Sequence, residues 1–277
     1  MRRLILVAVM VGAAQGAVAA DMPDFPALRG FVSDTPRTTR TNWEGIYVGG
    51  QGGYSAANMK FTGVNDSVVS DFMLKYGSQF VSPLNLPTWP ALGRTYGDAI
   101  TYGGFAGYNW QWDDAILGVE LNYNHAADLG AMFVGVPRYS SITTSGGSDY
   151  QGITNSQASL TVHDFGTVRL RAGYSAGAFM PYAFVGLALG RVDYYRSVTG
   201  TVMQGPTGTT PLTTVALTQT ETKTALNQIA YGYSFGAGSE VMLVGGLFAR
   251  GEYEYVRFTS PIDINMNTFR GGIGYKF

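Results

Sequence analysis

The feature that most constrains this chain is a period-two alternation of apolar with small, polar or charged residues, repeated from residue 43 to the last residue. In one segment Val168, Leu170 and Ala172 alternate with Arg169 and Arg171. Successive side chains of a β-strand point to opposite faces, so each run has one apolar face and one polar or small face. The pattern predicts an all-β protein.

Eight runs show this alternation and predict eight strands. They are longer than the usual strand of a soluble protein, which has about 5–6 residues. They suit tilted membrane-spanning strands, which need about 9–11 residues. The expected strands are 43–55, 100–111, 115–125, 160–175, 180–195, 225–241, 247–258 and 262–277.

Period alone does not separate a soluble β-sandwich from a membrane barrel, since both alternate apolar and polar faces. Charged residues make up only 13% of the chain, against about 25% in soluble domains. The polar faces carry few lysines, many glycines and charges of both signs, which suits a narrow interior better than a wetted surface. The composition therefore favours a barrel with apolar faces toward lipid, closed because an open edge in lipid leaves backbone groups unpaired.

The connections between the expected strands alternate in length. Three of them, around residues 112–114, 176–179 and 242–246, are short, and the last, around Pro261, is also short. The others are much longer, which is typical of outer-membrane barrels. We expect an eight-stranded antiparallel transmembrane β-barrel with short periplasmic turns, long extracellular loops and both termini in the periplasm. Segments 140–157 and 199–224, rich in Ser, Thr, Gly and Gln, are expected to be flexible surface loops.

The N-terminal residues predict export from the cytoplasm. Arg2 and Arg3 precede a short apolar run that ends in small residues around Ala19 and Ala20, as in a cleaved secretory signal. A short membrane anchor is the alternative, but the apolar run is shorter than the roughly 20 residues that span a bilayer. We expect a signal peptide (1–20), a periplasmic linker (21–41), and a barrel domain (42–277) in the outer membrane of a Gram-negative bacterium.

Composition excludes several kinds of chemistry. The chain has no cysteine, so thiol catalysis and thiolate metal sites are ruled out. Its only histidines, His125 and His163, have Asp128 and Asp164 as the nearest acids in sequence, which is too little for a hydrolase triad. The balance of 18 basic and 19 acidic residues gives no basic stripe for nucleic acid. We expect no enzyme activity, no metal, no cofactor and no nucleic-acid partner.

Charged residues on the expected inward faces are the main candidate site. An eight-stranded barrel has an interior just wide enough for side chains, and buried charges must be paired. We interpret them as a structural, salt-bridged plug. A narrow ion path or gate is the first alternative, and a carboxylate pair formed by Glu252 and Glu254 is the second. The predicted lumen charges are Glu120, Arg169, Arg171, Arg250, Glu252, Glu254 and Arg270.

Two features of the outer wall are predicted from the same alternation. The final segment, with Phe269, Ile273, Tyr275 and Phe277 on one face, resembles the C-terminal signal read by the bacterial barrel-assembly machinery. Aromatic residues near strand ends are expected to form girdles at the two membrane interfaces. These are Trp43, Tyr54, Trp110, Trp112, Tyr123, Tyr174, Tyr182, Tyr194 and Tyr255.

Three segments, 42–54, 104–111 and 166–174, together with the Phe277 terminus, resemble the alphaproteobacterial porin-like surface antigens, an OmpA-like group of eight-stranded outer-membrane barrels. The resemblance implies an abundant surface protein with a role in envelope integrity and host contact. It implies as partners the outer-membrane lipid and lipopolysaccharide, the assembly machinery, and a host or extracellular ligand bound through the loops. The alternative is a narrow pore or a receptor for haem or another small ligand, with His125 and His163 as candidate ligands.

Overall fold

The computed structural model describes residues 41–61, 92–135, 137–143, 148–260 and 263–277. The predicted signal peptide and all but the last residue of the predicted linker lie outside these residues, as does most of the first long connection. Among the described residues, no helix is long and apolar enough to cross a membrane.

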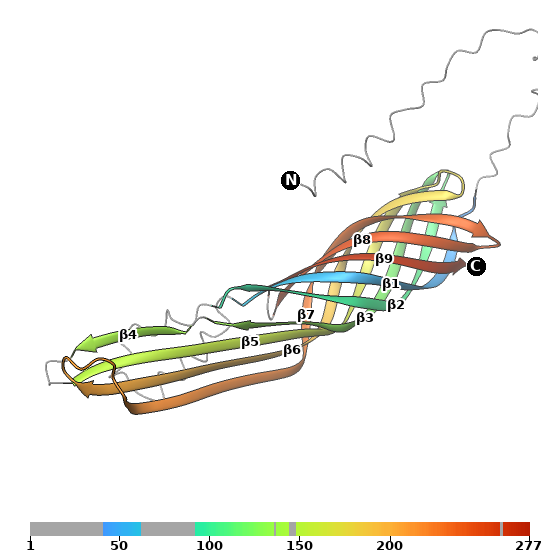
Figure 1. Cartoon of the computed structure of the whole chain (residues 1–277). Coiled ribbons are helices and arrows are strands. Elements are labelled where there is room, and N and C mark those ends of the chain that lie inside the picture. Colours follow the sequence, from blue (N-terminus) through green and yellow to red (C-terminus); the bar gives the residue numbers. More distant parts are fainter. Residues whose placement is uncertain (1–40, 62–91, 136, 144–147, 261–262) are drawn as a thin grey trace, which may run out of the picture. The chain divides into compact units, whose positions relative to one another are not determined.

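The described chain forms one antiparallel sheet that closes on itself (Figure 1). Eight strands make the ring, in the order β1-β2-β3-β5-β6-β7-β8-β9, and β9 pairs back onto β1. The remaining strand, β4, pairs with β5. The prediction of an eight-stranded antiparallel barrel is confirmed. The strands are β1 Gly45–Lys60, β2 Arg94–Trp112, β3 Ala115–Val134, β4 Arg138–Thr143, β5 Ser148–Tyr174, β6 Phe179–Pro206, β7 Thr214–Val244, β8 Leu247–Ser260 and β9 Asp263–Lys276.

The connections at one end of the ring are tight turns, as predicted. β2 and β3 are joined by Asp113 and Asp114, and β7 and β8 by Gly245 and Gly246. Asp113 and both glycines have positive φ angles of 52°, 58° and 87°. Asp tolerates this left-handed region and Gly adopts it without steric cost, so the sequence suits these turns.

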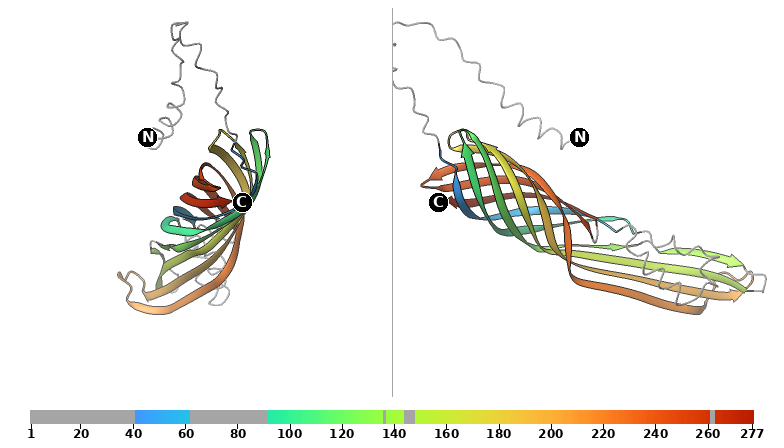
Figure 2. Two further views of the ribbon diagram at one scale, coloured as in Figure 1. Left: turned by 90° about the vertical axis from the view of Figure 1, so that its right-hand side faces the viewer. Right: turned by 180° about the vertical axis from the view of Figure 1, so that it is seen from behind.

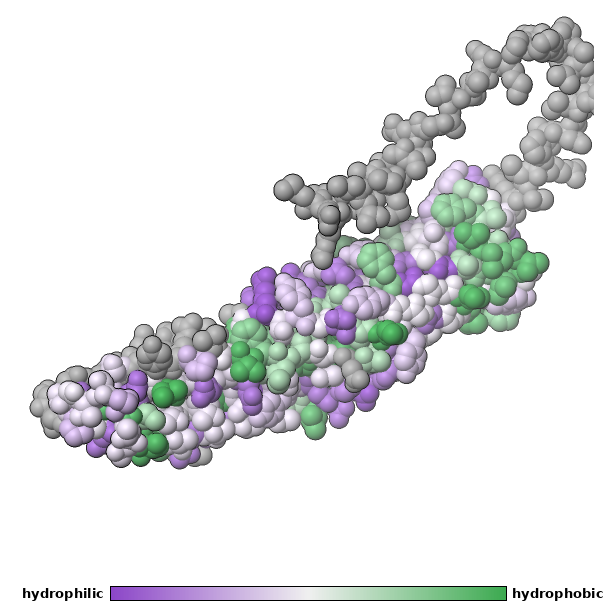
Figure 3. All heavy atoms as spheres, in the orientation of Figure 1, coloured by the Kyte–Doolittle hydropathy of each residue, from purple (hydrophilic) through white to green (hydrophobic). Residues whose placement is uncertain are grey.

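The outer wall of the ring is apolar and the inner wall holds the polar side chains. On β5, Val168 and Leu170 are 55% and 59% exposed, whereas Arg169 and Arg171 are 1% and 2% exposed. Apolar surface also shows over the ring in Figure 3. A soluble protein would bury the apolar face instead, so this arrangement fits a wall that faces lipid.

The interior contains two apolar clusters separated by charge. On β8, Phe248 belongs to one cluster and Val256 and Phe258 to the other, and the charged inward residues lie between them in sequence. The first cluster, toward the tight turns, contains Trp43, Tyr47, Phe105, Ile116, Met180, Tyr182, Phe184 and Phe248.

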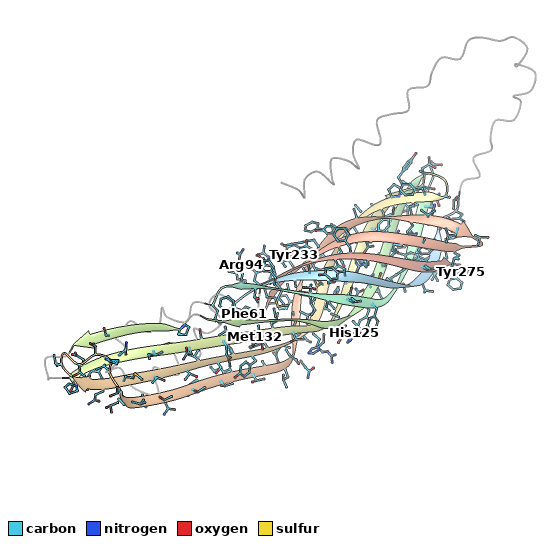
Figure 4. All side chains as sticks on the ribbon, viewed as in Figure 1. Phe61, Arg94, His125, Met132, Tyr233 and Tyr275 are labelled. Atoms are coloured by element: carbon cyan, nitrogen blue, oxygen red, sulfur yellow. The ribbon has the colours of Figure 1, made fainter. Side chains whose placement is uncertain are left out.

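The girdle prediction is wrong for three aromatic residues. Trp43 is 1% exposed and donates its indole N–H to the carbonyl of Gly177 over 3.2 Å. Tyr182 is buried because it shares the inward face of β6 with Met180. Tyr194 packs against the second apolar cluster, on the other side of the charges, whose buried residues include Leu160, Val162, Val256, Phe258, Ile264 and Met266. The other predicted girdle residues lie on the outward face, and Figure 4 shows two further tyrosines of that face, Tyr275 at one end of the ring and Tyr233 toward the other.

Beyond the ring, β5, β6 and β7 continue as a sheet with β4, and residues 129–134 of β3 pair with residues 157–162 of β5 in it (Figure 2). We call this sheet, residues 129–134, 138–143, 148–162, 193–206 and 214–230, the arm. The prediction that 140–157 and 199–224 are flexible loops is therefore wrong over most of their described length. Cross-strand hydroxyl pairs tie β6 to β7: Thr199 to Thr220 at 2.9 Å, and Thr201 to Thr218 at 3.3 Å. Such cross-strand pairs stabilise the sheet of the arm.

Irregular pairing marks the junction between ring and arm. The register shifts at His163 on β5 and at Asp193 on β6, and β-bulges of this kind bend a sheet. On β7, Asn227 has a φ of 54°, and its N–H donates to the Asp193 carboxylate over 2.6 Å. The Nε2 atom of His163 lies 2.9 Å from the other carboxylate oxygen of Asp193. Asp193 thus joins all three strands at the bend.

Asp193 should control the order of this bend. The N–H of Asn227, and then the hydrogen bond with His163, hold the pKa of the Asp193 carboxyl below its usual range. A depressed carboxyl pKa stabilises the folded state above the unfolded pKa of about 3.9, and this contribution is lost as pH falls through the folded pKa. We expect Asp193→Ala to speed hydrogen exchange of the Asn227 amide at pH 7, with the difference shrinking in acid. Asp263→Ala, which removes an ion pair with Arg257 elsewhere at the rim, should leave that amide unchanged; equal exchange in all three proteins would contradict the role of Asp193.

Candidate functional site: the charge network of the barrel lumen

Eight charged side chains fill the middle of the barrel, and all are buried. Each stands at an inward-facing position of its strand, which is why alternation brings them together from five strands. They are four arginines and four glutamates, so among these described residues the formal charges balance. β3 supplies Glu120, β5 supplies Arg169 and Arg171, β7 supplies Glu240, β8 supplies Arg250, Glu252 and Glu254, and β9 supplies Arg270.

Glu120 is the centre of one half of the network. Its Oε2 atom accepts hydrogen bonds from Arg250 at 2.6 Å and from Arg171 at 3.1 Å. The hydroxyl of Tyr47 donates to the same oxygen over 2.9 Å. Arg250 also donates to Glu240 over 2.6 Å. One carboxylate therefore holds two guanidinium groups from opposite parts of the ring.

Glu252 is the centre of the other half. Its Oε1 atom accepts from Arg169 at 2.6 Å and from Arg270 at 2.7 Å. The hydroxyl of Tyr182 donates to its Oε2 atom over 2.7 Å, and Arg270 also donates to Glu254. The two halves join because Arg169 lies 3.3 Å from Glu120 as well.

Aromatic rings cover the faces of three guanidinium groups. The central carbon of Arg250 lies 3.7 Å from the ring centre of Phe105, and that of Arg169 lies 4.4 Å from the ring centre of Phe184. Arg171 stands 4.1 Å from the ring centre of Tyr182. Because cation–π contacts stabilise desolvated cations, the first apolar cluster helps to hold the arginines in place.

An amide layer lies next to the charges. Gln51 on β1 donates to Asn122 at 2.9 Å and to Asn124 at 2.6 Å, both on β3. Arg270 reaches the carbonyl oxygen of Asn122 at 3.5 Å. The polar interior thus extends from the ion pairs into neutral hydrogen bonds between neighbouring strands.

The structure brings together all seven charged residues predicted from the sequence, and adds one that sequence reasoning missed. Glu240 lies two residues beyond Gly238, on the same inward face of β7. Its alternation with Ser239 and Val241 was the available signal. Glu240 was overlooked because it stands near the end of the expected strand 225–241.

The two histidines lie apart from this network, at the rim of the ring where it continues into the arm. His125 contacts Asp164 through Nδ1 at 2.8 Å, and Asp164 also pairs with Arg191 at 2.5 Å. His163 pairs with Asp193. In the described part of the chain, no group of three or more His, Cys, Asp or Glu side chains could hold a metal ion. These rim contacts lie at the junction with the arm and engage each histidine with an aspartate.

The C-terminal candidate residues all lie on the outer wall. Phe269, Ile273, Tyr275 and Phe277 are exposed on one face of β9 and after its end. Tyr253 on β8 packs on Phe269 with ring centres 4.8 Å apart. Their part in assembly stays a prediction.

A closed antiparallel ring with an apolar outer wall, a charged and hydrogen-bonded interior, and tight turns at one end defines the class of outer-membrane β-barrels. Residues 4–277 match the model of one family, described as "Outer membrane protein beta-barrel domain". The chain belongs to that family and is an outer-membrane protein.

Relatives of known description have the same location. The chain is 28% identical over 256 residues to the "22 kDa outer membrane protein" of Rhizobium leguminosarum bv. viciae, covering 88% of this chain and 82% of that protein. It is 26% identical over 300 residues to the "31 kDa outer-membrane immunogenic protein" of Brucella melitensis biotype 1, over the whole of both chains. These similarities agree with the alphaproteobacterial resemblance predicted from the sequence.

Two solved structures show a low similarity to this chain. Ail, the attachment invasion locus protein of Yersinia pestis, is 13% identical with a TM-score of 0.36, over 84% of this chain and 99% of that one. The N-terminal β-barrel domain of Pseudomonas aeruginosa OprF is 12% identical with a TM-score of 0.36, over 83% and 99%.

Proposed function

We propose that this protein is a non-conducting structural barrel of the outer membrane that presents its arm and loops at the cell surface. The observation that carries the proposal is the lumen network, in which four arginines and four glutamates are mutually paired and buried. Such a network joins five of the eight ring strands through their side chains and occupies the space that a pore would need.

The apolar clusters on both sides of the network support a closed lumen. Phe248 and Phe105 pack with ring centres 6.1 Å apart on one side of the charges. On the other side Phe258, Ile264 and Met266 are fully buried. An ion would have to cross both layers, and the Tyr47 and Tyr182 hydroxyls of the first layer already donate to glutamates of the network instead of being free to replace a hydration shell.

The proposed partners follow from this placement. The apolar outer wall would contact the outer-membrane lipid and lipopolysaccharide, and β9 would carry the signal for the assembly machinery. The arm would meet host or extracellular ligands. Residues 1–20 would serve as the secretory signal, residues 21–41 as a periplasmic linker, and 42–277 as the barrel. The role requires no catalysis and no cofactor, and each histidine is already engaged with an aspartate at the rim.

Conductance measurements test the proposal. In planar lipid bilayers at 1 M KCl, the refolded wild-type protein should produce no stepwise current, whereas a large porin measured in the same chamber should. The double variant Glu120→Ala/Arg250→Ala keeps the charge balance and both apolar layers, so it should also produce no steps, although it removes two side chains from the network centre. Steady conductance of the wild type would favour the narrow pore instead.

A further inference from the structure

In the arm, the described part of β7 pairs with a neighbouring strand, β6, along one of its two backbone edges. Residues 214–225 of β7 pair with β6, and the pairing of β7 with β8 begins only at Tyr231. Among the described residues, no strand pairs with the opposite edge of segment 214–230. We call this the outer edge of β7. It forms the border of the arm in Figures 1 and 2.

The charges of Glu221 and Lys223 limit indiscriminate pairing of this edge with another chain, but no proline or bulge interrupts it from residue 217 to residue 225. Edge strands are commonly interrupted by proline, by bulges or by inward charges, because their N–H and C=O groups can extend a sheet. From Leu217 to Ala225, β7 pairs with β6 residue by residue, without a shift of register or a proline. A regular stretch of this kind can accept another strand by sheet extension.

The sequence of the edge is complementary to itself in one antiparallel register. Pairing two copies about Thr222 places Glu221 of each copy opposite Lys223 of the other, and Thr220 opposite Thr224. Registers centred on Glu221 or Lys223 would place like charges opposite each other, which destabilises a sheet. Both residues also interact within one copy, so pairing across the edge would add to those contacts.

We propose that two copies of this chain on facing membranes join through their β7 outer edges, with a two-fold axis at Thr222. In every copy β7 runs from the arm toward the ring. Two copies in one membrane would present these edges running in parallel, whereas antiparallel pairing brings together arms from opposed surfaces. This inference rests on the proposed exposure of the arm at the cell surface. It does not depend on a closed lumen, so steady conductance of the wild type would contradict the proposed non-conducting barrel and leave the pairing of two copies untouched.

Vesicle clustering tests the proposal. The full chain is reconstituted into phosphatidylcholine vesicles, accessibility of the arm is verified with added protease, and clustering is followed by light scattering. Wild-type vesicles should cluster with rising protein density. Vesicles with Lys223→Glu or Glu221→Lys alone should cluster several-fold less. Mixing these two populations should restore clustering, because every contact then pairs an acidic edge with a basic one.

A matched control keeps the composition of the wild type. The double variant Glu221→Lys/Lys223→Glu should cluster with itself but not with the wild type, because mixed contacts then place like charges opposite each other. Heat-dependent gel migration verifies that each variant is folded. Absence of clustering by the wild type would overturn the proposal. So would wild-type clustering by either single variant, or a mixture that clusters no more than its parts.

Discussion

Replacing Glu120 with alanine should lower the free energy of unfolding by about 3–5 kcal/mol, the usual loss when one partner of a buried ion pair is removed. Glu120 accepts hydrogen bonds from Arg171, Arg250 and Tyr47 and lies within ion-pair distance of Arg169. Without it, three buried cations share the remaining carboxylates. The measurement is urea unfolding of the refolded barrel in detergent micelles or lipid vesicles, followed by tryptophan fluorescence.

The matched control for this prediction is Glu44→Ala. Glu44 is an exposed glutamate whose hydrogen bonds involve its backbone N–H and C=O, and its carboxylate interacts with Lys276 only through space. Its replacement should change the free energy of unfolding by less than about 0.5 kcal/mol. Equal losses for the two variants would show that the network does not stabilise the barrel.

Replacing Gly103 with alanine should prevent most of the protein from folding into a barrel. Gly103 faces Asn124 on β3, and a Cβ atom there would lie 1.9 Å from the carbonyl oxygen of Tyr123. That oxygen belongs to the backbone and cannot move without opening the sheet. We expect a loss of at least about 3 kcal/mol, at the severe end of overpacking changes. The measurement is the fraction of protein that shows heat-dependent gel migration after refolding.

Gly251→Ala separates this steric effect from the general effect of losing a glycine. Gly251 lies in the middle of β8, and a Cβ atom there would meet no other atom within 4 Å. The variant should fold to the wild-type extent. If both variants fold normally, the close approach of β2 and β3 at Gly103 is not required for the closed ring.

Period-two alternation predicted the ring strands well because one physical constraint, lipid on one face and lumen on the other, acts on every residue. For β3, the prediction began at Ala115, as in the structure, and the inward position of Glu120 followed from its neighbours. The same constraint located six further lumen charges. The alternation did not predict which of these charges pair with each other. Glu120 and Arg250 are 130 residues apart in sequence, and their pairing depends on the order of the strands in the ring and on how far neighbouring strands are shifted along each other.

The arm escaped prediction because its outermost strand, β7, lacks the alternation of apolar and polar residues that marks the ring strands. In β7, threonines at 218, 220, 222 and 224 alternate with other polar residues, so the two faces differ little in polarity. Ser, Thr and Gln in such a stretch are as common in loops as in strands. Trp43 and Tyr182 were misplaced for a related reason: aromatic side chains suit a membrane interface and a packed interior equally well.

The span of the lumen network across the sequence also leads to an expectation for the order of assembly. Glu120 becomes available when β3 is made, yet Arg250 and Arg270 belong to the last two strands. Until those strands arrive, the early charges have no complete set of partners and would be costly to carry into lipid. We therefore expect insertion and closure to advance together, with the β8–β9 hairpin supplying the last partners of the early charges as it closes the ring.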